Sequence, residues 1–256
     1  NQIFFPQKFR IFHNLIKKSV YYEHNLQLIC IKLRLSVMST ALILLTWNEV
    51  EASRVIFPKI KKEWVDEILV VDGGSTDGTI EEAKIVGFQI IKQEIKGHGG
   101  AIITGVKNTK SDNIIIFGSD GNHEPEEIPR LIKKIEEGFD QVVVSRFTKK
   151  SIIKEPNYGM VEFGNRFFTF FVNLLFKGNL SDTMTDSRII TRKAFEEIDF
   201  DALLLDSTLT MSIRGMKKKQ KMGEIVGDQG ERIGGQRKMK PFKTGMLLIK
   251  RIIKEL

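Results

Sequence analysis

Polar residues gather at three places in the sequence where an apolar run stops. Carboxylate, amide and imidazole side chains follow these runs within a few residues. Carboxylate and amide oxygens suit Mg²⁺ and Mn²⁺, which in turn bridge phosphates. One Asp-Gly pair of this kind is most often a turn or a helix cap, but three clusters at one sheet edge would indicate a binding site. The clusters are residues 46–49 (TWNE), 72–79 (DGGSTDGT) and 118–123 (GSDGNH).

The second cluster could hold a nucleotide base. The carboxylate of Asp72 can accept paired N–H groups from a uracil- or guanine-type base, or it can stabilise a turn. Gly73 and Gly74 would let the backbone approach a ligand closely. Another glycine-rich stretch, residues 96–100 (KGHGG), matches neither the dinucleotide-binding pattern nor the P-loop pattern. Both of those nucleotide-binding folds are therefore disfavoured.

The third cluster is a candidate metal site. Asp120 offers the oxygen ligands that Mg²⁺ and Mn²⁺ prefer. Two acids would normally stand here, yet the residue two positions before Asp120 is Gly118. His123 could be a general base, but a structural hydrogen bond beside the site is the favoured interpretation. The residues alone leave open whether this cluster is a metal site or a turn.

Alternating elements must position these clusters. From Met38 to about Arg146, short β-branched runs alternate with stretches of helical period. This alternation predicts an α/β fold with a parallel sheet covered by helices on both faces. Thr79, three residues before Glu82, predicts a capping box. The expected strands are 41–45, 67–71, 88–91, 113–117 and 141–145, and the expected helices are 50–60, 79–86, 101–109 and 126–137.

Length and composition fit one soluble globular domain. The chain has 256 residues, with 41% hydrophobic and 28% charged residues. Its net charge is +8, from 40 Lys+Arg against 32 Asp+Glu, which suggests an anionic partner. The single cysteine, Cys30, excludes a disulfide framework and a cysteine zinc site, so a reducing, cytosolic compartment is favoured.

The two ends of the chain differ from its middle. Residues 1–37 are basic and aromatic without a persistent period, and are expected to be either a membrane-touching arm or a poorly ordered extension. A domain is expected over 38–240, followed by an amphipathic basic tail at 241–256. No apolar run reaches the roughly 18–20 residues that span a bilayer. Residues 163–176 and the tail could lie in a membrane interface, or be buried in the domain or a dimer.

Several motifs, in order, resemble glycosyltransferase family 2. They are TWNE, VVDGGSTDGT, KGHGGAIITG, SDGNHEPEEIPRL and VSR, followed by SDTMTDSRIITRKAF and ERIGGQRKMK. The resemblance runs from about residue 41 to 240 and is strongest to dolichol-phosphate mannosyltransferase and other polyprenyl-phosphate sugar synthases. It implies a GT-A fold, with a Rossmann-like, mostly parallel sheet flanked by helices and with C-terminal amphipathic interface helices.

The resemblance also implies roles for individual residues. Asp120 and Asn122 would face a metal, Mg²⁺ or Mn²⁺, and the donor diphosphate. Asp120 and Arg146 would act in catalysis. The residues expected at the nucleotide are Thr46, Asn48, Glu49, Asp72 and Gly74, and those expected at donor or acceptor phosphates are Arg146, Arg232 and Lys238.

The chain departs from the family pattern at several positions. The family's Asp-x-Asp is Gly118-Ser119-Asp120 here, so the first acid is absent. We therefore expect Asp120 as the direct metal ligand, with Asn122, water and the diphosphate completing the shell. The other departures are Gly73 for the second Asp of Asp-Asp-Gly-Ser, Asp186 where Gly is frequent, Arg237 in place of Ser, and Thr210 near a common Glu.

The expected function is inverting transfer of a hexose, mannose or glucose, from a nucleotide-sugar to a polyprenyl (dolichyl) phosphate. The donor would be GDP-mannose or UDP-glucose. Alternatives are transfer to a saccharide hydroxyl, and a non-catalytic subunit that binds a nucleotide-sugar. Nucleic acid is disfavoured as a partner, because acids at the strand ends would repel phosphates without a metal. A peripheral location on the cytoplasmic face of a membrane is expected, and the protein could be an oligomer.

Overall fold

A computed structural model describes residues 38–156, 158–234 and 239–256. The residues from Ser39 onward form one compact unit. The expectations for residues 1–37 and for Lys238 and Arg237 fall outside the described residues.

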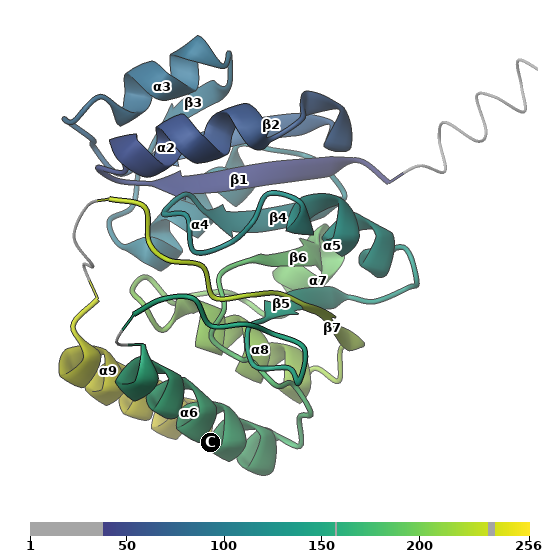
Figure 1. Ribbon diagram of the computed structural model, residues 1–256. Coiled ribbons are helices and arrows are strands. Elements are labelled where there is room, and N and C mark those ends of the chain that lie inside the picture. The colour runs from purple at the N-terminus through teal and green to yellow at the C-terminus, as the bar shows by residue number, and fades with distance from the viewer. Residues whose placement is uncertain (1–37, 157, 235–238) are drawn as a thin grey trace, which may run out of the picture. The chain divides into compact units, whose positions relative to one another are not determined.

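A seven-stranded sheet forms the centre of this unit, in the order β3-β2-β1-β4-β6-β5-β7 (Figure 1). All neighbouring strands pair in parallel except β6, which is antiparallel to both β4 and β5. This arrangement confirms the predicted mostly parallel α/β fold. The strands are β1 (Thr40–Thr46), β2 (Glu67–Asp72), β3 (Gln89–Lys92), β4 (Asn113–Gly118), β5 (Gln141–Ser145), β6 (Arg188–Thr191) and β7 (Met222–Val226).

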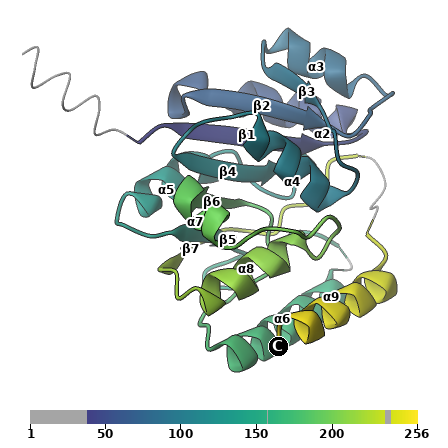
Figure 2. The ribbon, with the colours of Figure 1, turned by 180° about the vertical axis from the view of Figure 1, so that it is seen from behind.

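Helices cover both faces of the sheet, as Figures 1 and 2 show from opposite sides. Two short 3₁₀ turns, η1 (Phe57–Lys59) and η2 (Lys62–Trp64), join α2 to β2. The helices are α2 (Val50–Ile56), α3 (Thr79–Ile85), α4 (His98–Lys107), α5 (Glu127–Ile135), α6 (Gly159–Phe176), α7 (Arg192–Glu197), α8 (Ser207–Lys217) and α9 (Pro241–Glu255).

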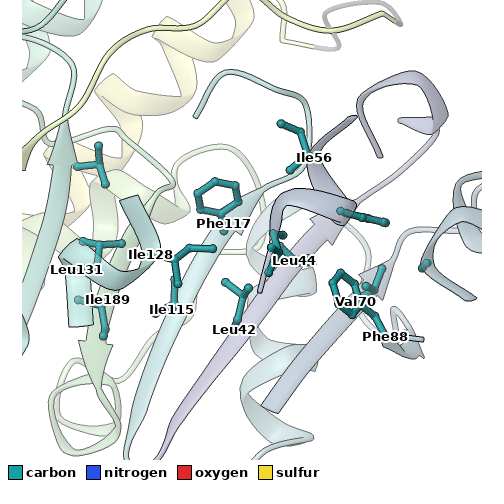
Figure 3. Close-up of a cluster of buried hydrophobic side chains, with 14 of the residues drawn as sticks. Leu42, Leu44, Ile56, Val70, Phe88, Ile115, Phe117, Ile128, Leu131 and Ile189 are labelled. Carbon is teal, nitrogen blue, oxygen red and sulfur yellow. The ribbon is translucent and has the colours of Figure 1, made fainter. Parts of the chain in front are cut away.

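The strands are apolar on both faces, because each face packs against helices. Leu42 and Leu44 of β1 point toward the core shared with α2, α3 and α5, where Figure 3 shows them beside Ile115 and Phe117 of β4. The intervening Ile43 points to the other face, where α4, α7 and α8 complete a second core. This alternation follows from the two-residue period of a strand.

Helix α8 also carries a third apolar cluster, on its side away from the sheet. There α8 packs against α6 and α9, which lie side by side in Figures 1 and 2. The buried members of this cluster are Val172, Leu209, Ile213, Leu248 and Ile252. Among the described residues, the helices lack the combination of length and apolar character that crossing a bilayer would require.

The structure corrects three local expectations. Strands β6 and β7 were not predicted. The helix expected from residue 50 to 60 ends at Ile56 and continues as the 3₁₀ turn η1. The capping box is wrong, because Gly78, with a φ of 105°, is the N-cap of α3. The Thr79 hydroxyl instead donates to Asp77 and accepts the N–H of Glu49.

Candidate active site

The three polar clusters meet at one edge of the sheet. Strands β2, β1 and β4 are parallel neighbours, so their carboxyl ends lie together. Thr46 pairs with Asp72 across the first strand pair, and Leu45 pairs with Gly118 across the second. Ligands of open α/β sheets bind beyond such strand ends. The predicted convergence of the clusters is therefore present in the fold.

The end of β2 presents unsatisfied polar atoms. Oδ2 of Asp72 accepts the N–H groups of Gly74 and Ser75 at 2.8 and 2.9 Å. Its other oxygen, Oδ1, is buried and has no hydrogen-bond partner among the described residues, and the same holds for Oγ1 of the adjacent Thr46. Buried polar atoms are rarely left unpaired in proteins. These two atoms could receive N–H and O–H donors from a base or sugar.

A web of loop contacts fixes the shape of this half of the site. Asn48, at a φ of 52°, donates its N–H to Ser75 and accepts the N–H of Thr76 at 2.9 Å. Asp77 accepts the N–H of Val50 at 3.0 Å, at the start of α2. Asn48 was predicted to bind the nucleotide, and the structure places it where it ties the β1 loop to the β2 loop.

The end of β4 carries the acidic half of the site. Asp120 accepts the backbone N–H of Asn122 at 3.2 Å and its side-chain amide N–H at 2.9 Å. The amide oxygen of Asn122 is buried and has no hydrogen-bond partner among the described residues. Asn122 therefore turns its amide nitrogen toward Asp120 and keeps its amide oxygen unpaired. The expected role of both residues at a metal stays a prediction.

Arg232 forms a bridge over this acidic half. Its Nη1 contacts Oδ2 of Asp120 at 2.9 Å, and its Nη2 contacts Oε2 of Glu49 at 2.5 Å. The loop that carries it lies against the end of β4, where Ile233 N–H donates to the carbonyl of Asp120 at 3.0 Å. The guanidinium therefore holds positive charge between two carboxylates, in the region where a divalent cation would be expected.

A further carboxylate, Asp186, faces Asp120 from the loop before β6. Burial of Asp120, and next the charge of Asp186, raise the pKa of Asp120 above its ordinary value of 3.8, although Arg232 acts in the opposite direction. The pKa of Asp186 itself is lowered, because His98 and then His123 outweigh the effect of its partial burial. Like charges facing each other in this way favour the binding of a cation.

Two histidines flank Asp186. His98 Nε2 lies 3.7 Å from one carboxylate oxygen, and His123 Nε2 lies 3.9 Å from the other. The buried His123 also contacts Glu127 at 3.0 Å through Nδ1. Burial tends to lower the pKa of His123, but Glu127 and then Asp186 raise it overall. These contacts agree with a structural hydrogen bond for His123 rather than with a free base.

Arg146 is held from several sides. Its Nε and Nη2 contact the two oxygens of Asp182 at 2.7 and 3.1 Å. Its Nη1 donates to the hydroxyl of Tyr158 and to the side chain of Gln229. Although burial lowers the pKa of this guanidinium, Asp182 raises it strongly overall. Its predicted roles in catalysis and phosphate binding stay predictions, and in this structure Arg146 joins β5, α6 and the loop at Gln229.

The described residues fit a metal ion only together with a ligand. Among them, no three His, Cys, Asp or Glu side chains are arranged to hold a metal ion by themselves. Asp120 and the unpaired oxygen of Asn122 supply hard oxygen donors, which suit Mg²⁺ or Mn²⁺. Mg²⁺ commonly binds through one or two carboxylates and substrate phosphates. A site completed by a diphosphate is therefore chemically consistent with this donor set.

Asp186, His98 and Glu127 lie at or beside the site but were not predicted as site residues. Asp186 was noticed only as a departure from a family pattern. The useful signal was the pairing of two departures, since the chain lacks an acid at Gly118 and gains one at Asp186. Their proximity depends on the antiparallel strand β6, which the sequence did not reveal.

The chain is similar in sequence to known glycosyltransferases. The model of the family described as "Glycosyl transferase family 2" matches residues 45–199. The chain is similar to glycosyltransferase AglJ of Haloferax volcanii, at 28% identity over 64% of this chain and 51% of the relative. It is also similar to a dolichyl-phosphate hexose transferase of the same organism, at 26% identity over 84% of this chain and 92% of the relative. The chain thus spans about half the length of the first relative.

A solved structure shares the fold. Glucosyl-3-phosphoglycerate synthase from Mycobacterium tuberculosis, in complex with Mn²⁺, uridine diphosphate and glucosyl-3-phosphoglycerate, superimposes with a TM-score of 0.66 at 19% identity. The match covers 85% of this chain and 80% of that one. It confirms the predicted GT-A fold class, and the family model covers more than half of the chain. The chain therefore belongs to glycosyltransferase family 2.

Proposed function

We propose that this protein is an inverting hexosyltransferase that moves a sugar from a nucleoside diphosphate to a polyprenyl phosphate. The observation that carries the proposal is the pairing of orphaned polar atoms with an acidic site at one sheet edge. Asp72 and Thr46 offer unpaired oxygens for the nucleoside, and Asp120 lies at the end of a neighbouring strand. The dolichyl-phosphate hexose transferase relative supports the choice of acceptor.

The donor would lie across the ends of β2, β1 and β4. Its base or ribose would satisfy Asp72 Oδ1 and Thr46 Oγ1, and its diphosphate would reach Asp120 and Asn122. A Mg²⁺ or Mn²⁺ ion held there would neutralise charge on the leaving diphosphate. Arg232 would exchange its contacts with Asp120 and Glu49 for phosphate oxygens, which suits the planar fork of a guanidinium.

The acceptor requires no dedicated base. A phosphate monoester has its second pKa near 6, so it is mostly ionised at neutral pH. One of its oxygens would attack the anomeric carbon as the bond to the diphosphate breaks, with inversion of configuration. Catalysis would then rest on positioning and on charge stabilisation. The buried, paired state of His123 is compatible with this chemistry.

The lipid part of the acceptor would lie along α6 and α9. Both helices expose large apolar side chains, including Phe163 at 71% and Phe170 at 62% exposure on α6 and Phe242 at 83% on α9. Exposed apolar surface of this extent usually marks an interaction site. Lys243 and Lys250 of α9 are also exposed and suit anionic headgroups. Peripheral association with the cytoplasmic face of a membrane is part of this proposal.

The start of α6 is connected to the site. The hydroxyl of Tyr158, directly before α6, accepts from Arg146 at 3.1 Å. Thr169 within α6 is hydrogen-bonded to Thr183 at 2.9 Å, on the loop that carries Asp186. A lipid lying on α6 could therefore bring its phosphate to the acidic end of the site.

A transfer assay tests the proposal. The purified protein is incubated with Mn²⁺ or Mg²⁺ and labelled GDP-mannose or UDP-glucose, with and without polyprenyl phosphate. We expect label in the lipid phase only when the lipid is present, and we expect Asp120→Ala to abolish it. Tight donor binding without transfer from either sugar would contradict the proposal in favour of a binding subunit. Label entering a saccharide instead would identify a hydroxyl acceptor.

A further inference from the structure

Gly118 and Asp186 share one small volume at the acidic end of the site. A Cβ atom built on Gly118 would lie 2.9 Å from Oδ2 of Asp186 and 3.8 Å from Oδ1 of Asp120. The first distance is shorter than non-bonded contacts allow, so a side chain on residue 118 would require the carboxylate of Asp186 to move from its present position. The carboxylate of Asp186 thus fills the space into which a side chain on residue 118 would extend.

We propose that Asp186 is the second carboxylate of the metal and diphosphate site, in place of the acid that position 118 lacks. This inference rests on the proposed donor class, a nucleoside diphosphate sugar. A side chain on residue 118 would start beside Asp120, since its Cβ would lie 3.8 Å from Oδ1 of Asp120. Asp186 delivers its charge to that same place from a different loop.

The loop around Asp186 is built to hold it still. Thr185 and Ser187 on either side are fully buried, whereas Asp186 keeps 36% of its side chain exposed. Buried Arg188 donates to the carbonyl of Thr185 through Nε at 3.2 Å and Nη2 at 2.6 Å. Asp182 anchors the start of the loop through Arg146. A carboxylate fixed in this way loses little freedom when it binds a cation.

Asp186 is also placed so that its carboxylate could share a cation with Asp120. The two carboxylates repel each other, and a divalent cation would relieve that repulsion. The amide oxygen of Asn122 adds a third donor without a partner among the described residues. The competing role for Asp186 is structural, as the acid that pairs with His98 and His123 at 3.7 and 3.9 Å.

Metal binding separates these two roles. Asp186→Asn keeps the shape of the side chain and removes its charge. The affinity of UDP and of GDP is measured by calorimetry with Mn²⁺ and again with EDTA, and bound Mn²⁺ is counted by electron paramagnetic resonance. Mn²⁺ raises the nucleotide affinity of the wild type, and we expect this gain to be at least about tenfold smaller in the variant. The affinity in EDTA should be unchanged or higher, because the variant lacks a carboxylate that repels the diphosphate. Wild-type Mn²⁺ affinity, or equal losses under both conditions, would overturn the proposal.

A double variant that moves the carboxylate from position 186 to position 118 tests the shared volume directly. Asp186→Gly alone should lose Mn²⁺ binding, and Gly118→Asp with Asp186→Gly should recover it to within a few-fold of wild type. Such non-additivity is expected of residues that serve one ligand. A folded double variant that does not recover would show that Asp186 acts through the histidines instead. Should the double variant not fold, the comparison of Mn²⁺ with EDTA for Asp186→Asn still decides.

The control is Asp199→Asn, on an exposed turn after α7. Its φ of 46° suits Asn as well as Asp, so the change tests only the loss of one surface charge. Failure of the proposed function would look different from failure of this inference. In that case the wild-type protein would bind Mn²⁺ with UDP or GDP and respond to Asp186→Asn, yet transfer no sugar to polyprenyl phosphate.

Discussion

Buried charge at the edge of the site is organised around Arg146 and Asp182. The two side chains form a bidentate ion pair, and Asp182 is fully buried. Asp182 also accepts the N–H of Met184 at 3.1 Å. Such a pair offsets the cost of burying either charge only while both partners are present. Its integrity therefore supports the loop that presents Asp186.

Asp182→Asn should destabilise the protein by about 3–5 kcal/mol, since the buried Arg146 would lose the carboxylate that forms its ion pair. The free energy of unfolding, measured in urea at neutral pH, checks this expectation. Glu197→Gln removes one partner of the exposed Lys193 pair and should change stability by less than about 0.5 kcal/mol. Equal effects of the two substitutions would contradict the structural role of the buried pair.

The same pair predicts how stability depends on pH. Despite burial, which acts the other way, Arg146 lowers the pKa of Asp182 below its ordinary 3.8 in the folded protein. Its contribution is therefore fully present above the unfolded pKa and is lost as pH falls through the lower folded pKa. The stability difference between wild type and Asp182→Asn should stay constant from pH 7 to about 5 and shrink below about 4. A stability difference that already narrows above pH 5 would contradict a lowered pKa for Asp182.

Asp72 allows a test of the nucleoside end. In Asp72→Asn the remaining oxygen would still accept from Gly74 and Ser75, and an NH₂ group would replace the orphaned Oδ1. That group would meet the N–H donors of a base, so affinity for UDP or GDP should fall about tenfold or more, with or without metal. Calorimetry in EDTA measures the effect. Unchanged affinity, matching Asp199→Asn, would remove Asp72 from the base site.

For individual residues, the sequence predicted which side chains lie at the site edge when those residues directly follow an apolar run. Asp72 and Asp120 could be assigned to one edge because parallel strands bring their carboxyl ends together. Asp186 could not, since its position depends on a buried loop and on Arg188, 0% exposed, holding the carbonyl of Thr185. Contacts of that kind leave no periodic signal in the sequence.

At the scale of elements, the glycines of the KGHGG stretch have a packing role. The N–H groups of Gly99 and Gly100 both donate to the carbonyl of Leu203, at 3.0 and 3.3 Å. A Cβ on Gly99 would lie 1.8 Å from the carbonyl oxygen of Ala202. The start of α4 and the loop before α8 can approach this closely only without a side chain. This contact also places His98 beside Ser207, at 2.7 Å.

Gly99→Ala should therefore lower stability by several kcal/mol, because the backbone at Ala202 cannot yield as a side chain could. The matched control is Gly164→Ala within α6, where a Cβ would meet nothing within 4 Å. Alanine there should raise stability by about 0.5–1 kcal/mol through its better helix propensity. Thermal unfolding should show a lower melting temperature for Gly99→Ala and a slightly higher one for Gly164→Ala. Similar effects from both would contradict the close approach.

Burial alone does not explain which strands were predicted, since the weakly buried β3 was predicted and the buried β6 was not. Strands β1, β2 and β4 are long, apolar runs packed on both faces, and their sequence pattern identified them. Strand β6 has only four residues, two of them polar, and β7 is only half-buried and contains Gly223. Neither shows the apolar run of a central strand. Tertiary pairing, rather than local propensity, makes them strands.

At the scale of the whole described unit, charge and apolar surface occupy different parts of the fold. The acidic site lies at the strand ends, while α6 and α9 present aromatic and aliphatic side chains to solvent. Their inward faces, through Val172 and Leu248, pack on α8. Both helices therefore keep an apolar side exposed after the protein has folded. An outward apolar face with basic neighbours is typical of helices that lie in a membrane interface.

The triple variant Phe163→Gln, Phe170→Gln and Leu174→Gln tests that interface. These side chains are 62–71% exposed, so their replacement should leave the unfolding temperature nearly unchanged. Burying each in a bilayer would contribute about 1.5–3 kcal/mol, so binding to phosphatidylglycerol vesicles should fall by at least tenfold in co-sedimentation. Glutamine at Val55 and Ile85, exposed on α2 and α3, is the control and should bind as wild type does.

Salt and self-association complete this test. High salt should weaken wild-type binding only in part, because the apolar share is not screened. Vesicle binding unchanged in the triple variant would show that α6 does not enter the bilayer. Sedimentation without lipid addresses the alternative that this face joins two copies of the chain. If the wild type and the control variant sediment as dimers and the triple variant as a monomer, the apolar face is a protein interface. The lipid acceptor would then not lie on it.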